Sequence, residues 1–396
     1  MIKILVFGYY DDFSHFFNEL RQYHQSKSDV KYIYATNNMS GYYSWPTRDR
    51  YLLRPISMLA SKNRNSEFEN ALDMLQKQLS KLRINHSAVS YLPKIRQIST
   101  ILNVEKPDLV IISGDSKPSA YIFKTLCSEK NIPMRFFEQG PYSTTVFSKT
   151  GVLMNQCDII DEYKSFDMLE KPVNRLKTRK YRYFDLLQIV SPDVEKSQLR
   201  DKILFSIIKN RLKRSEKIKN QEGKCLLLAL QDPDDVNFLT YSGFGCNESL
   251  IHFTLEALPI GWSCIIREHP KCRGQYSREV YRLIECSDFA ILDSTKKPVD
   301  YWKNIDAFVC VNSLMAFEAA DRNVKVFVLG QSVYSNLFET PRTVEELNDG
   351  LKKNTASYRN IKEKKDEFIR RYFYKGHFRK PTTQLFDGLI QSMEQP

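Results

Sequence analysis

The sequence predicts an α/β protein with two domains, and three observations support this prediction. The chain has 396 residues, more than a single hydrophobic core usually holds. Apolar runs alternate with amphipathic helical patterns in both halves, which is typical of βαβ units with a parallel sheet. A basic, polar segment at 209–220 separates the halves. We therefore expect domains at 1–205 and 206–396.

The elements of the first half follow from apolar periodicity and from turn residues. Helices are indicated where apolar residues recur every three or four positions. Strands are indicated where branched or aromatic residues stop at a Gly, Asn or Pro turn. In chain order we expect strand 3–7, helix 13–23, strand 30–35, a polar loop at 36–49, helices 68–82 and 94–102, strand 108–113, helix 120–130 and strand 133–137.

The second half repeats the same alternation after the basic segment. The C-terminal stretch 358–380 is helical in its first part, strongly basic and rich in aromatic residues. Before it, in chain order, we expect strand 225–230, helix 247–257, strand 262–268, helix 277–285, strands 289–293 and 307–311, helix 313–322 and strand 324–329.

Two halves of this kind correspond to Rossmann-like domains facing each other across a cleft, the GT-B-like architecture of many nucleotide-sugar glycosyltransferases. No Gly-x-Gly-x-x-Gly follows the first strand of either half, and no Gly-x-x-x-x-Gly-Lys-Ser/Thr occurs. These absences disfavour dinucleotide oxidoreductases and P-loop NTPases. Open α/β sheets bind ligands at the carboxyl ends of their strands, so candidate site residues should follow strands directly.

The composition indicates a folded protein with an anionic partner. Hydrophobic residues make up 42% of the chain and aromatic residues 12%, enough to build full cores. The net charge of +12 suits nucleic acid, an anionic membrane surface or a phosphorylated substrate. Because the basic residues are dispersed and form no recognisable motif, no nucleic-acid partner is expected.

The cysteines and the apolar runs bear on the cellular environment. None of the eight cysteines forms a Cys-x-x-Cys pair, and several lie in apolar runs, so we expect reduced core residues rather than zinc ligands or disulfides. The first residues are expected to form a strand rather than a signal peptide. No run approaches the roughly 20 apolar residues that span a bilayer. We expect a cytoplasmic protein.

Three carboxylates stand in the turn Gln231-Asp-Pro-Asp-Asp235, directly after a predicted strand. The turn is compatible with a metal site, a nucleophile or a solvated loop. No histidine stands at ligand spacing nearby and Pro233 interrupts the acids, which disfavours a metal. Asp232 lies at the first bend out of the strand, where a rigidly held carboxylate can act as the nucleophile in glycosyl transfer.

A second polar turn, Arg267-Glu-His-Pro270, ends strand 262–268. Strand alternation places Arg267 and His269 on one face and Glu268 on the other. Pro270 ends the strand and fixes the turn behind the imidazole. A histidine and an arginine together can neutralise a phosphate or a carboxylate. The remaining histidines are expected to be ordinary surface or core residues.

A third turn, Asn312-Ser313, starts the predicted helix 313–322. A helix start presents free N–H groups that suit a phosphate, although either residue can equally be a simple N-cap. Glu318 lies too far from Ser313 for a capping box, which leaves its carboxylate available for sugar hydroxyls.

In the first domain, the turn Glu138-Gln-Gly-Pro-Tyr142 follows strand 133–137. Gly140 permits a sharp turn or close approach of a ligand, and Tyr142 can stack on a sugar. Glu138 is equally compatible with a general base for the acceptor and with an ordinary turn residue.

Taken together, these turns resemble those of the capsule and O-antigen β-Kdo transferases, most closely the retaining WbbB-type enzymes of glycosyltransferase family ninety-nine. Each motif is weak alone, but both halves contain them in the family's order, and the ordered set is fairly specific. The matching stretches are 137–142 with 151–152, 227–235 with 241–245, 267–270, and 312–319 running into 326–330.

The resemblance implies transfer of Kdo from CMP-β-Kdo with retention, by double displacement through a covalent intermediate on Asp232. It also implies contacts of His269 and Ser313 with the CMP phosphate and of Glu318 with the ribose, similar to those of bacterial sialyltransferases. Relatives often have a lysine before the His-Pro pair, where this chain has an Arg-Glu pair. The remaining candidates are Glu138 as a second catalytic residue and Gln231, Arg267, Pro270 and Tyr142 as substrate-binding residues.

The implied donor and acceptor fit the bulk properties. Kdo carries a carboxylate and CMP a phosphate, and CMP leaves as a monophosphate, so no metal or other cofactor is expected. The expected partners are CMP-β-Kdo and a lipid-linked oligosaccharide acceptor at the inner membrane. The basic segment 370–380 suits peripheral contact with anionic lipid, although a return to brace the first domain is slightly favoured. Whether the chain is a module of a larger synthase stays open.

Two alternatives to this function also stay open. The His-Pro and Ser…Glu patterns suit other cytidine-nucleotide transferases, such as those for sialic acid or CDP-glycerol. A protein of a different class, a non-catalytic partner in polysaccharide export, would have the same fold without the chemistry.

Overall fold

The structure is a computed structural model in which two compact units are distinguished by their internal contacts. Within the described residues, unit 1 contains 1–152 and 369–394, and unit 2 contains 223–368. The predicted domain boundary between 205 and 206 lies outside the described residues. These are 1–9, 11–56, 68–82, 84–152, 223–293, 302–353 and 361–394.

Unit 1 is built on a sheet that has seven strands in the described part of the chain, in the order β12-β6-β5-β4-β1-β2-β3. The strands from β5 to β3 are parallel, while β6 and β12 are antiparallel to their neighbours. The order reverses between β1 and β4, as in a Rossmann-like sheet. The strands are β1 (Ile2–Gly8), β2 (Val30–Thr36), β3 (Arg50–Leu52), β4 (Leu109–Ser113), β5 (Met134–Gln139), β6 (Thr144–Ser148) and β12 (Tyr374–Lys375).

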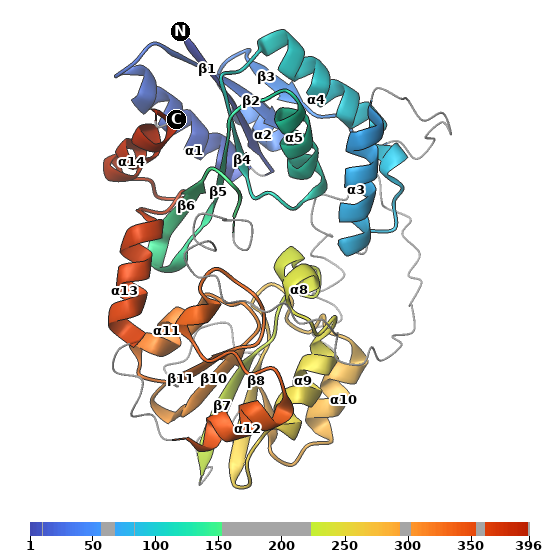
Figure 1. The fold of residues 1–396 in the computed structure, drawn as a ribbon, viewed down its shortest axis with the longest axis vertical. Coiled ribbons are helices and arrows are strands. Elements are labelled where there is room, and N and C mark those ends of the chain that lie inside the picture. Colours follow the sequence, from blue (N-terminus) through green and yellow to red (C-terminus); the bar gives the residue numbers. More distant parts are fainter. Residues whose placement is uncertain are drawn as a thin grey trace. The chain divides into compact units, whose positions relative to one another are not determined.

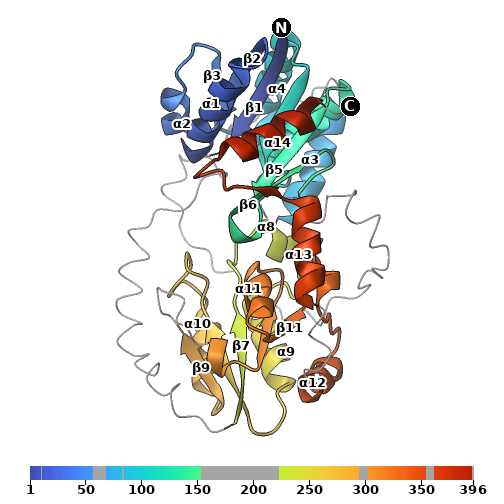
Figure 2. The same ribbon diagram turned by 90° about the vertical axis from the view of Figure 1, so that its left-hand side faces the viewer.

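Helices cover both faces of the unit 1 sheet (Figure 1 and Figure 2). Successive strand residues point to opposite faces, so Leu5 packs with α3, α4 and α5 while its neighbour Val6 lies in a core cluster with α1 and α14. Among the buried polar side chains of this unit, Lys94 donates to Ser119 Oγ at 3.2 Å. The helices are α1 (Asp11–Gln25), α2 (Met39–Ser44), α3 (Glu69–Lys81), α4 (Leu92–Glu105), α5 (Pro118–Glu129) and α14 (Thr383–Glu394).

Unit 2 has an entirely parallel sheet, whose described strands follow the order β11-β10-β7-β8-β9 (Figure 1). The chain enters at β7, adds β8 and β9 on one side and then β10 and β11 on the other. The order therefore reverses between β7 and β10. The strands are β7 (Lys224–Ala229), β8 (Trp262–Arg267), β9 (Ala290–Asp293), β10 (Ala307–Cys310) and β11 (Lys325–Val328).

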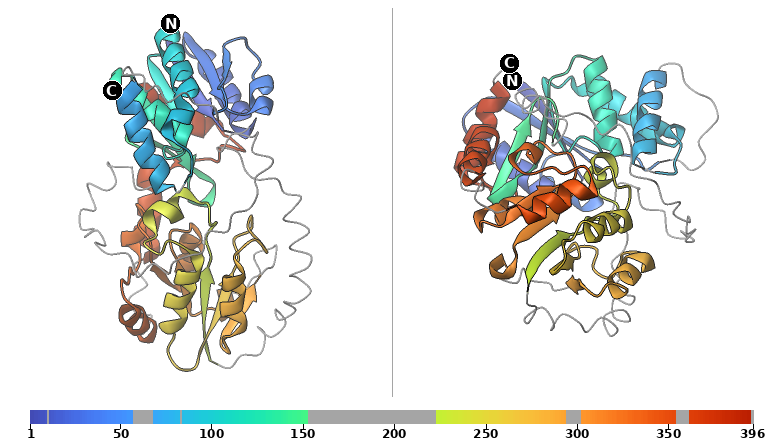
Figure 3. Two further views of the ribbon diagram at one scale, coloured as in Figure 1. Left: turned by 90° about the vertical axis from the view of Figure 1, so that its right-hand side faces the viewer. Right: turned by 60° about the horizontal axis from the view of Figure 1, so that its bottom comes forward.

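The unit 2 sheet is also covered on both faces (Figure 3). Helices α8, α9, α10 and α12 contribute to one core together with Leu226 and Leu228. On the other face α11 carries Phe317, which stacks on Phe368 of α13 with ring centroids 6.5 Å apart. The helices are α8 (Val236–Tyr241), α9 (Asn247–Glu256), α10 (Arg278–Glu285), α11 (Met315–Asp321), α12 (Val344–Lys352) and α13 (Ile361–Tyr372).

The predicted α/β class with two Rossmann-like sheets is confirmed, and every predicted strand is present with small shifts at its ends. Short elements were missed because they lack a full period of apolar residues. Helix α2 lies inside the predicted polar loop and is started by Asn38, whose side chain accepts the Gly41 N–H at 3.1 Å. The short helix α8, the later helices α12 and α14, and the strands β3, β6 and β12 were also not predicted.

The C-terminal segment was predicted to belong to the second domain, but the described residues from Ile369 onward belong to unit 1. Strand β12 pairs with β6, and Phe378 packs against Phe13, Phe16 and Phe137. Phe378 is only 5% exposed, so it is a core residue. The favoured expectation, that this segment braces the first domain, is confirmed. Among the helices that the structure describes, none is both long and apolar enough to cross a bilayer.

Candidate active site

Three of the predicted turns lie side by side at the carboxyl edge of the unit 2 sheet. Strands β10, β7 and β8 are consecutive in the sheet, and the turns at Asn312, Gln231 and Glu268 follow directly after them. The first two turns flank the point where the strand order reverses. Ligands of open α/β sheets bind at this point, so the fold presents these turns where a donor would be expected.

The backbone around Gln231 and Asp232 is tightly held. The Gln231 N–H donates to Asn247 Oδ1 at 3.1 Å, and its carbonyl accepts from Asn247 Nδ2 at 3.2 Å. Asp232 Oδ1 accepts the Asp234 N–H at 3.0 Å, which fixes the carboxylate against its own loop. Asp235 caps helix α8 by accepting a backbone N–H of the first turn at 2.8 Å, and burial raises the pKa of Asp235. Of the three carboxylates, Asp235 is engaged as a helix cap, and the role of Asp232 toward a ligand stays a prediction.

Arg267 and Glu268 are both buried and contribute to the framework of the second turn. Arg267 Nη1 donates to Asp293 Oδ2 at 2.8 Å, and these two side chains are 7% and 1% exposed. Glu268 Oε1 accepts the Tyr281 hydroxyl at 2.6 Å and the Gly274 N–H at 2.9 Å, and burial raises the pKa of Glu268. The structure gives Arg267 a buried carboxylate partner, and its predicted substrate contact stays a prediction.

One hydroxyl joins the first turn to the second. Tyr276 accepts the His269 N–H at 3.0 Å and donates to the Gln231 carbonyl at 3.0 Å. The Tyr276 side chain is buried, so solvent does not compete strongly for these contacts. The turns that carry Asp232 and His269 are therefore positioned together, while Pro270 lies exposed just after the imidazole.

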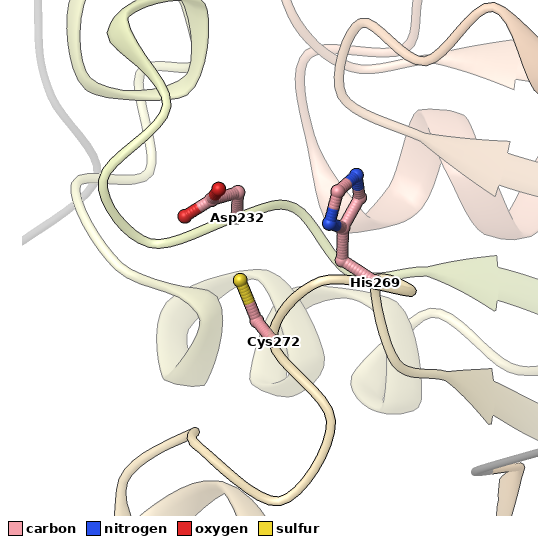
Figure 4. A group of neighbouring side chains, drawn as sticks. All are labelled: Asp232, His269 and Cys272. Carbon is pink, nitrogen blue, oxygen red and sulfur yellow. The ribbon is translucent and has the colours of Figure 1, made fainter. Parts of the chain in front are cut away.

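Figure 4 shows the side chains of Asp232, His269 and Cys272 as close neighbours, with the Cys272 thiol directed toward Asp232. One potential ligand atom from each lies within 4.8 Å of those of the other two. Burial raises the pKa of the Cys272 thiol, and the Asp232 carboxylate raises it further. Burial lowers the pKa of His269, against an opposing effect of Asp232. The cluster therefore favours a neutral imidazole and a protonated thiol beside one carboxylate.

Two basic residues follow His269 in the same loop. After burial and Asp232, the positive charges of Lys271 and Arg273 are among the influences on His269, and both lower its pKa. Lys271 is exposed, whereas Arg273 Nε is buried and makes no hydrogen bond within the described residues. The Arg273 Nε–H suits an anionic ligand group, because a buried N–H without a hydrogen-bond partner costs free energy.

The third turn is longer than predicted, because helix α11 begins only at Met315. Ser313 Oγ accepts the Met315 N–H at 3.3 Å, while the N-cap residue of α11 is Leu314, which makes no side-chain capping hydrogen bond. Asn312 Nδ2 is buried without a hydrogen-bond partner among the described residues, and Glu318 is exposed on the helix. The contacts of Ser313 and Glu318 with a nucleotide stay predictions.

Glu138 and Tyr142 lie in unit 1, at the end of β5. Strand β5 extends past the predicted end, and Glu138 Oε1 accepts the Gln139 N–H at 3.0 Å. Tyr142 has φ 51° and Ser143 φ 61°, a left-handed conformation that is uncommon outside glycine. A Cβ at Gly140 would lie 2.3 Å from Thr144 Oγ1, so only glycine fits there. This strained turn keeps the Tyr142 ring at the surface, 45% exposed.

Sequence reasoning missed the residues that connect the turns, namely Asn247, Tyr276 and Cys272. Their contacts join positions far apart in the chain, and no local pattern predicts them. One sequence feature could have indicated Cys272, because it lies two residues after the His-Pro pair. It was not considered, since the cysteines were expected to be core residues.

One comparison with known protein families covers the three turns. Residues 162–337 match a family model described as capsule polysaccharide biosynthesis protein. The match covers less than half of the chain and includes the turns at Gln231, His269 and Ser313. Its first part, up to 222, lies outside the described residues. No curated protein sequence matches this chain.

Three similar solved structures are distant in sequence. A UDP-GlcNAc 2-epimerase from Neisseria meningitidis bound to UDP-GlcNAc is 11% identical, with a TM-score of 0.39 and coverage of 100% of both chains. The Thermosulfurimonas dismutans KpsC β-Kdo 2,7 transferase is 10% identical, with a TM-score of 0.39 and coverage of 88% of this chain and 90% of that one. The KpsC β-Kdo 2,4 transferase is 15% identical, with a TM-score of 0.37 and coverage of 72% and 88%.

Proposed function

We propose that this protein is a glycosyltransferase of capsule polysaccharide or O-antigen synthesis that transfers Kdo from CMP-β-Kdo with retention. The observation that carries the proposal is the position of Asp232. It lies at the reversal point of the unit 2 sheet, next to His269 and near two cations, in a region that matches the capsule biosynthesis family. A transferase of an anionic sugar from an anionic nucleotide requires this combination of one carboxylate and several cations.

The first step is attack by Asp232. A carboxylate oxygen forms a bond to the anomeric carbon of Kdo while the bond to the CMP phosphate oxygen breaks, and CMP leaves with the electron pair. The contact of Oδ1 with the Asp234 N–H orients the carboxylate within its loop. This step inverts the anomeric carbon and leaves a sugar ester on Asp232.

The second step restores the configuration. An acceptor hydroxyl loses its proton to a base and attacks the same carbon, and the ester oxygen returns to Asp232 as carboxylate. Two inversions give net retention. In unit 1 we propose Glu138 as the base and Tyr142 as a stacking surface for an acceptor sugar, since the ring is held at the surface by a strained turn.

Donor binding is proposed to use the other turns of unit 2. His269 and Ser313 contact the CMP phosphate, Glu318 contacts the ribose, and Arg273 binds the phosphate or the Kdo carboxylate through its unpaired Nε. Gln231, Arg267 and Pro270 shape these turns, because Gln231 and Arg267 are held by buried partners. A lipid-linked oligosaccharide is the proposed acceptor, and contact with an anionic membrane surface would bring it within reach.

The test is to trap the ester. The full chain is incubated with fresh CMP-β-Kdo without acceptor and analysed by intact-mass spectrometry, followed by peptide mapping. We expect a gain of one Kdo residue on Asp232, and no gain in Asp232→Asn. Transfer to acceptor should fall by about 10³-fold or more in that variant, as is typical when a nucleophile is removed.

A neighbouring carboxylate gives the matched control. Asp234 is exposed and contributes its backbone rather than its side chain, so Asp234→Asn should still form the ester. Unchanged product formation by Asp232→Asn would contradict the proposal and favour a non-catalytic export partner. In a thermal-shift panel, stabilisation by CMP is expected. A preference for CDP would favour a CDP-glycerol transferase, and a preference for UDP would overturn cytidine-nucleotide use.

A further inference from the structure

The cluster of Asp232, His269 and Cys272 contains a thiol for which the proposed transfer has no use. In His269-Pro-Lys-Cys272 two residues separate the histidine from the cysteine, a spacing common between metal ligands. The backbone closes a turn here, because the Cys272 N–H donates to the His269 carbonyl at 3.0 Å. Both side chains therefore leave one turn on the same side and lie close to Asp232 (Figure 4).

The framework around these three side chains is already ordered. Tyr276 fixes the turn of His269 to the turn of Asp232, and the Gln275 N–H donates to the Cys272 carbonyl at 3.0 Å. Asp232 accepts one N–H through Oδ1, and a carboxylate has about four lone-pair positions, so it keeps capacity for an ion.

The distances fit a small ion after minor side-chain rotation. In a tetrahedral zinc site, bonds of about 2.0–2.3 Å place the ligand atoms roughly 3.3–3.6 Å from one another. The three candidate atoms already lie within 4.8 Å of each other. We expect rotation of the three side chains to close this gap.

The donor set selects the class of metal. A thiolate is a soft ligand that magnesium and calcium do not favour, whereas zinc binds thiolate, imidazole and carboxylate together. One Asp and one deprotonated Cys balance the charge of a divalent ion, and Asp235 adds negative charge nearby. Three protein ligands leave a fourth position for water, as in open zinc sites.

We propose that Asp232, His269 and Cys272 bind one zinc-type divalent cation, with the fourth coordination position open. The sequence disfavoured a metal here because no histidine stands near Asp232 along the chain. In the folded sheet β7 and β8 are neighbours, so the turn after β8 brings His269 next to the turn that carries Asp232.

Zinc at this position inhibits the transferase, an inference that rests on the proposed function. An ion bound to the Asp232 carboxylate occupies the lone pairs that attack the sugar. The metal-bound chain is therefore expected to be inactive, and removal of the ion by a chelator is expected to restore transfer.

The binding test uses cobalt as a spectroscopic probe. The full chain is stripped of metal, kept reduced without thiols and titrated with Co²⁺. We expect a thiolate-to-cobalt charge-transfer band that saturates at one ion per chain and disappears on addition of Zn²⁺. Loss of a partner that only supports a metal ligand costs roughly 10–100-fold in affinity, so Cys272→Ser should lose the band and bind zinc about 100-fold or more weakly.

Controls separate this site from other thiols. Cys286 is an exposed free cysteine outside the cluster, and Cys286→Ser should keep the full band. His269→Ala should weaken binding while the thiolate band remains detectable at high cobalt. Thermal unfolding without metal establishes that each variant is folded, with Cys272→Ala as a second replacement. No band in the wild type, or a band retained in Cys272→Ser, would overturn the metal site.

An activity arm distinguishes the two proposals. The ratio of CMP-Kdo consumption with and without one equivalent of Zn²⁺ should fall in the wild type and stay near one in Cys272→Ser. A chain that gives the cobalt band but never consumes the donor overturns the transferase and keeps the metal site. A chain that consumes the donor without a cobalt band overturns the metal site alone.

Discussion

Arginines in the loop around His269 have different surroundings, although a sequence pattern treats them alike. Arg267 is buried against Asp293, while Arg273 Nε is buried without a hydrogen-bond partner among the described residues. The guanidinium of Arg273 is therefore the better candidate for an anionic ligand group. The sequence favoured Arg267 as the anion-binding residue because it lies beside a His-Pro pair. The structure shows that its charge is already compensated by Asp293 of the neighbouring strand β9.

Arg273→Gln is expected to raise the KM for the donor about tenfold or more with little change in kcat. The physical reason is loss of a charge-assisted hydrogen bond worth about 1.5–3 kcal/mol, made equally to substrate and transition state. Steady-state donor consumption measures both constants. Arg278 is exposed at the start of α10, and Arg278→Gln serves as the matched control. Equal KM values in the two variants would contradict a role for Arg273 in donor binding.

His24 predicts how the stability of unit 1 depends on pH. The side chain is 3% exposed and its Nδ1 is 2.9 Å from the Tyr32 hydroxyl, and burial lowers the pKa of His24 against a smaller opposing effect of Glu394. A lowered pKa means that the unfolded chain takes up a proton first as the pH falls. Stability should therefore be full above about pH 6.5 and decrease as the pH falls below that value.

The measurement is urea unfolding of the full chain between pH 7.5 and 5, monitored by a probe in unit 1. His24→Asn should flatten the decrease in unfolding free energy toward low pH. His15 is exposed on the same helix, and His15→Asn should leave the wild-type slope. If all three proteins lose stability equally on acidification, His24 is not the group responsible.

Elements differ in how much of their structure the sequence predicts. Strands such as β4 and β7 are continuous branched apolar runs, so their positions and the turns after them were predictable. Helix α8 has six residues and starts from a side-chain cap at Asp235. It was not predicted because the acids of this turn were interpreted only as candidate site residues. The turns of the site were predictable but the contacts between them were not, because Tyr276 reaches Gln231 and Cys272 reaches Asp232 only after the sheet has formed.

The C-terminal segment carries a prediction about stability at the level of elements. Phe378 is buried among Phe13, Phe16 and Phe137, so Phe378→Ala should lower the free energy of unfolding by about 3–5 kcal/mol. The adjacent Arg379 forms an exposed ion pair with Asp12, and Arg379→Ala should cost less than about 1 kcal/mol. Thermal or urea unfolding compares the two. A small effect of Phe378→Ala would mean that the segment does not brace unit 1.

The whole molecule carries a net charge of +12, which bears on the proposed contact with a membrane that holds a lipid-linked acceptor. Phe378, one of the aromatic residues of the basic segment 370–380, is buried in the unit 1 core and is not available for insertion into lipid. Attraction to an anionic surface is then mainly electrostatic, and such attraction is screened by salt, with a Debye length of about 10 Å at 0.1 M and about 3 Å at 1 M.

We therefore expect the full chain to sediment with vesicles that contain anionic phospholipid at low ionic strength and to be released as salt approaches about 0.5 M. Neutral phosphatidylcholine vesicles are the control and should bind little at either salt concentration. Binding to both vesicle types that persists in high salt would contradict a purely electrostatic contact, because apolar insertion is not weakened by screening. Release by salt from anionic vesicles alone would support surface charge as the means by which the protein approaches its acceptor.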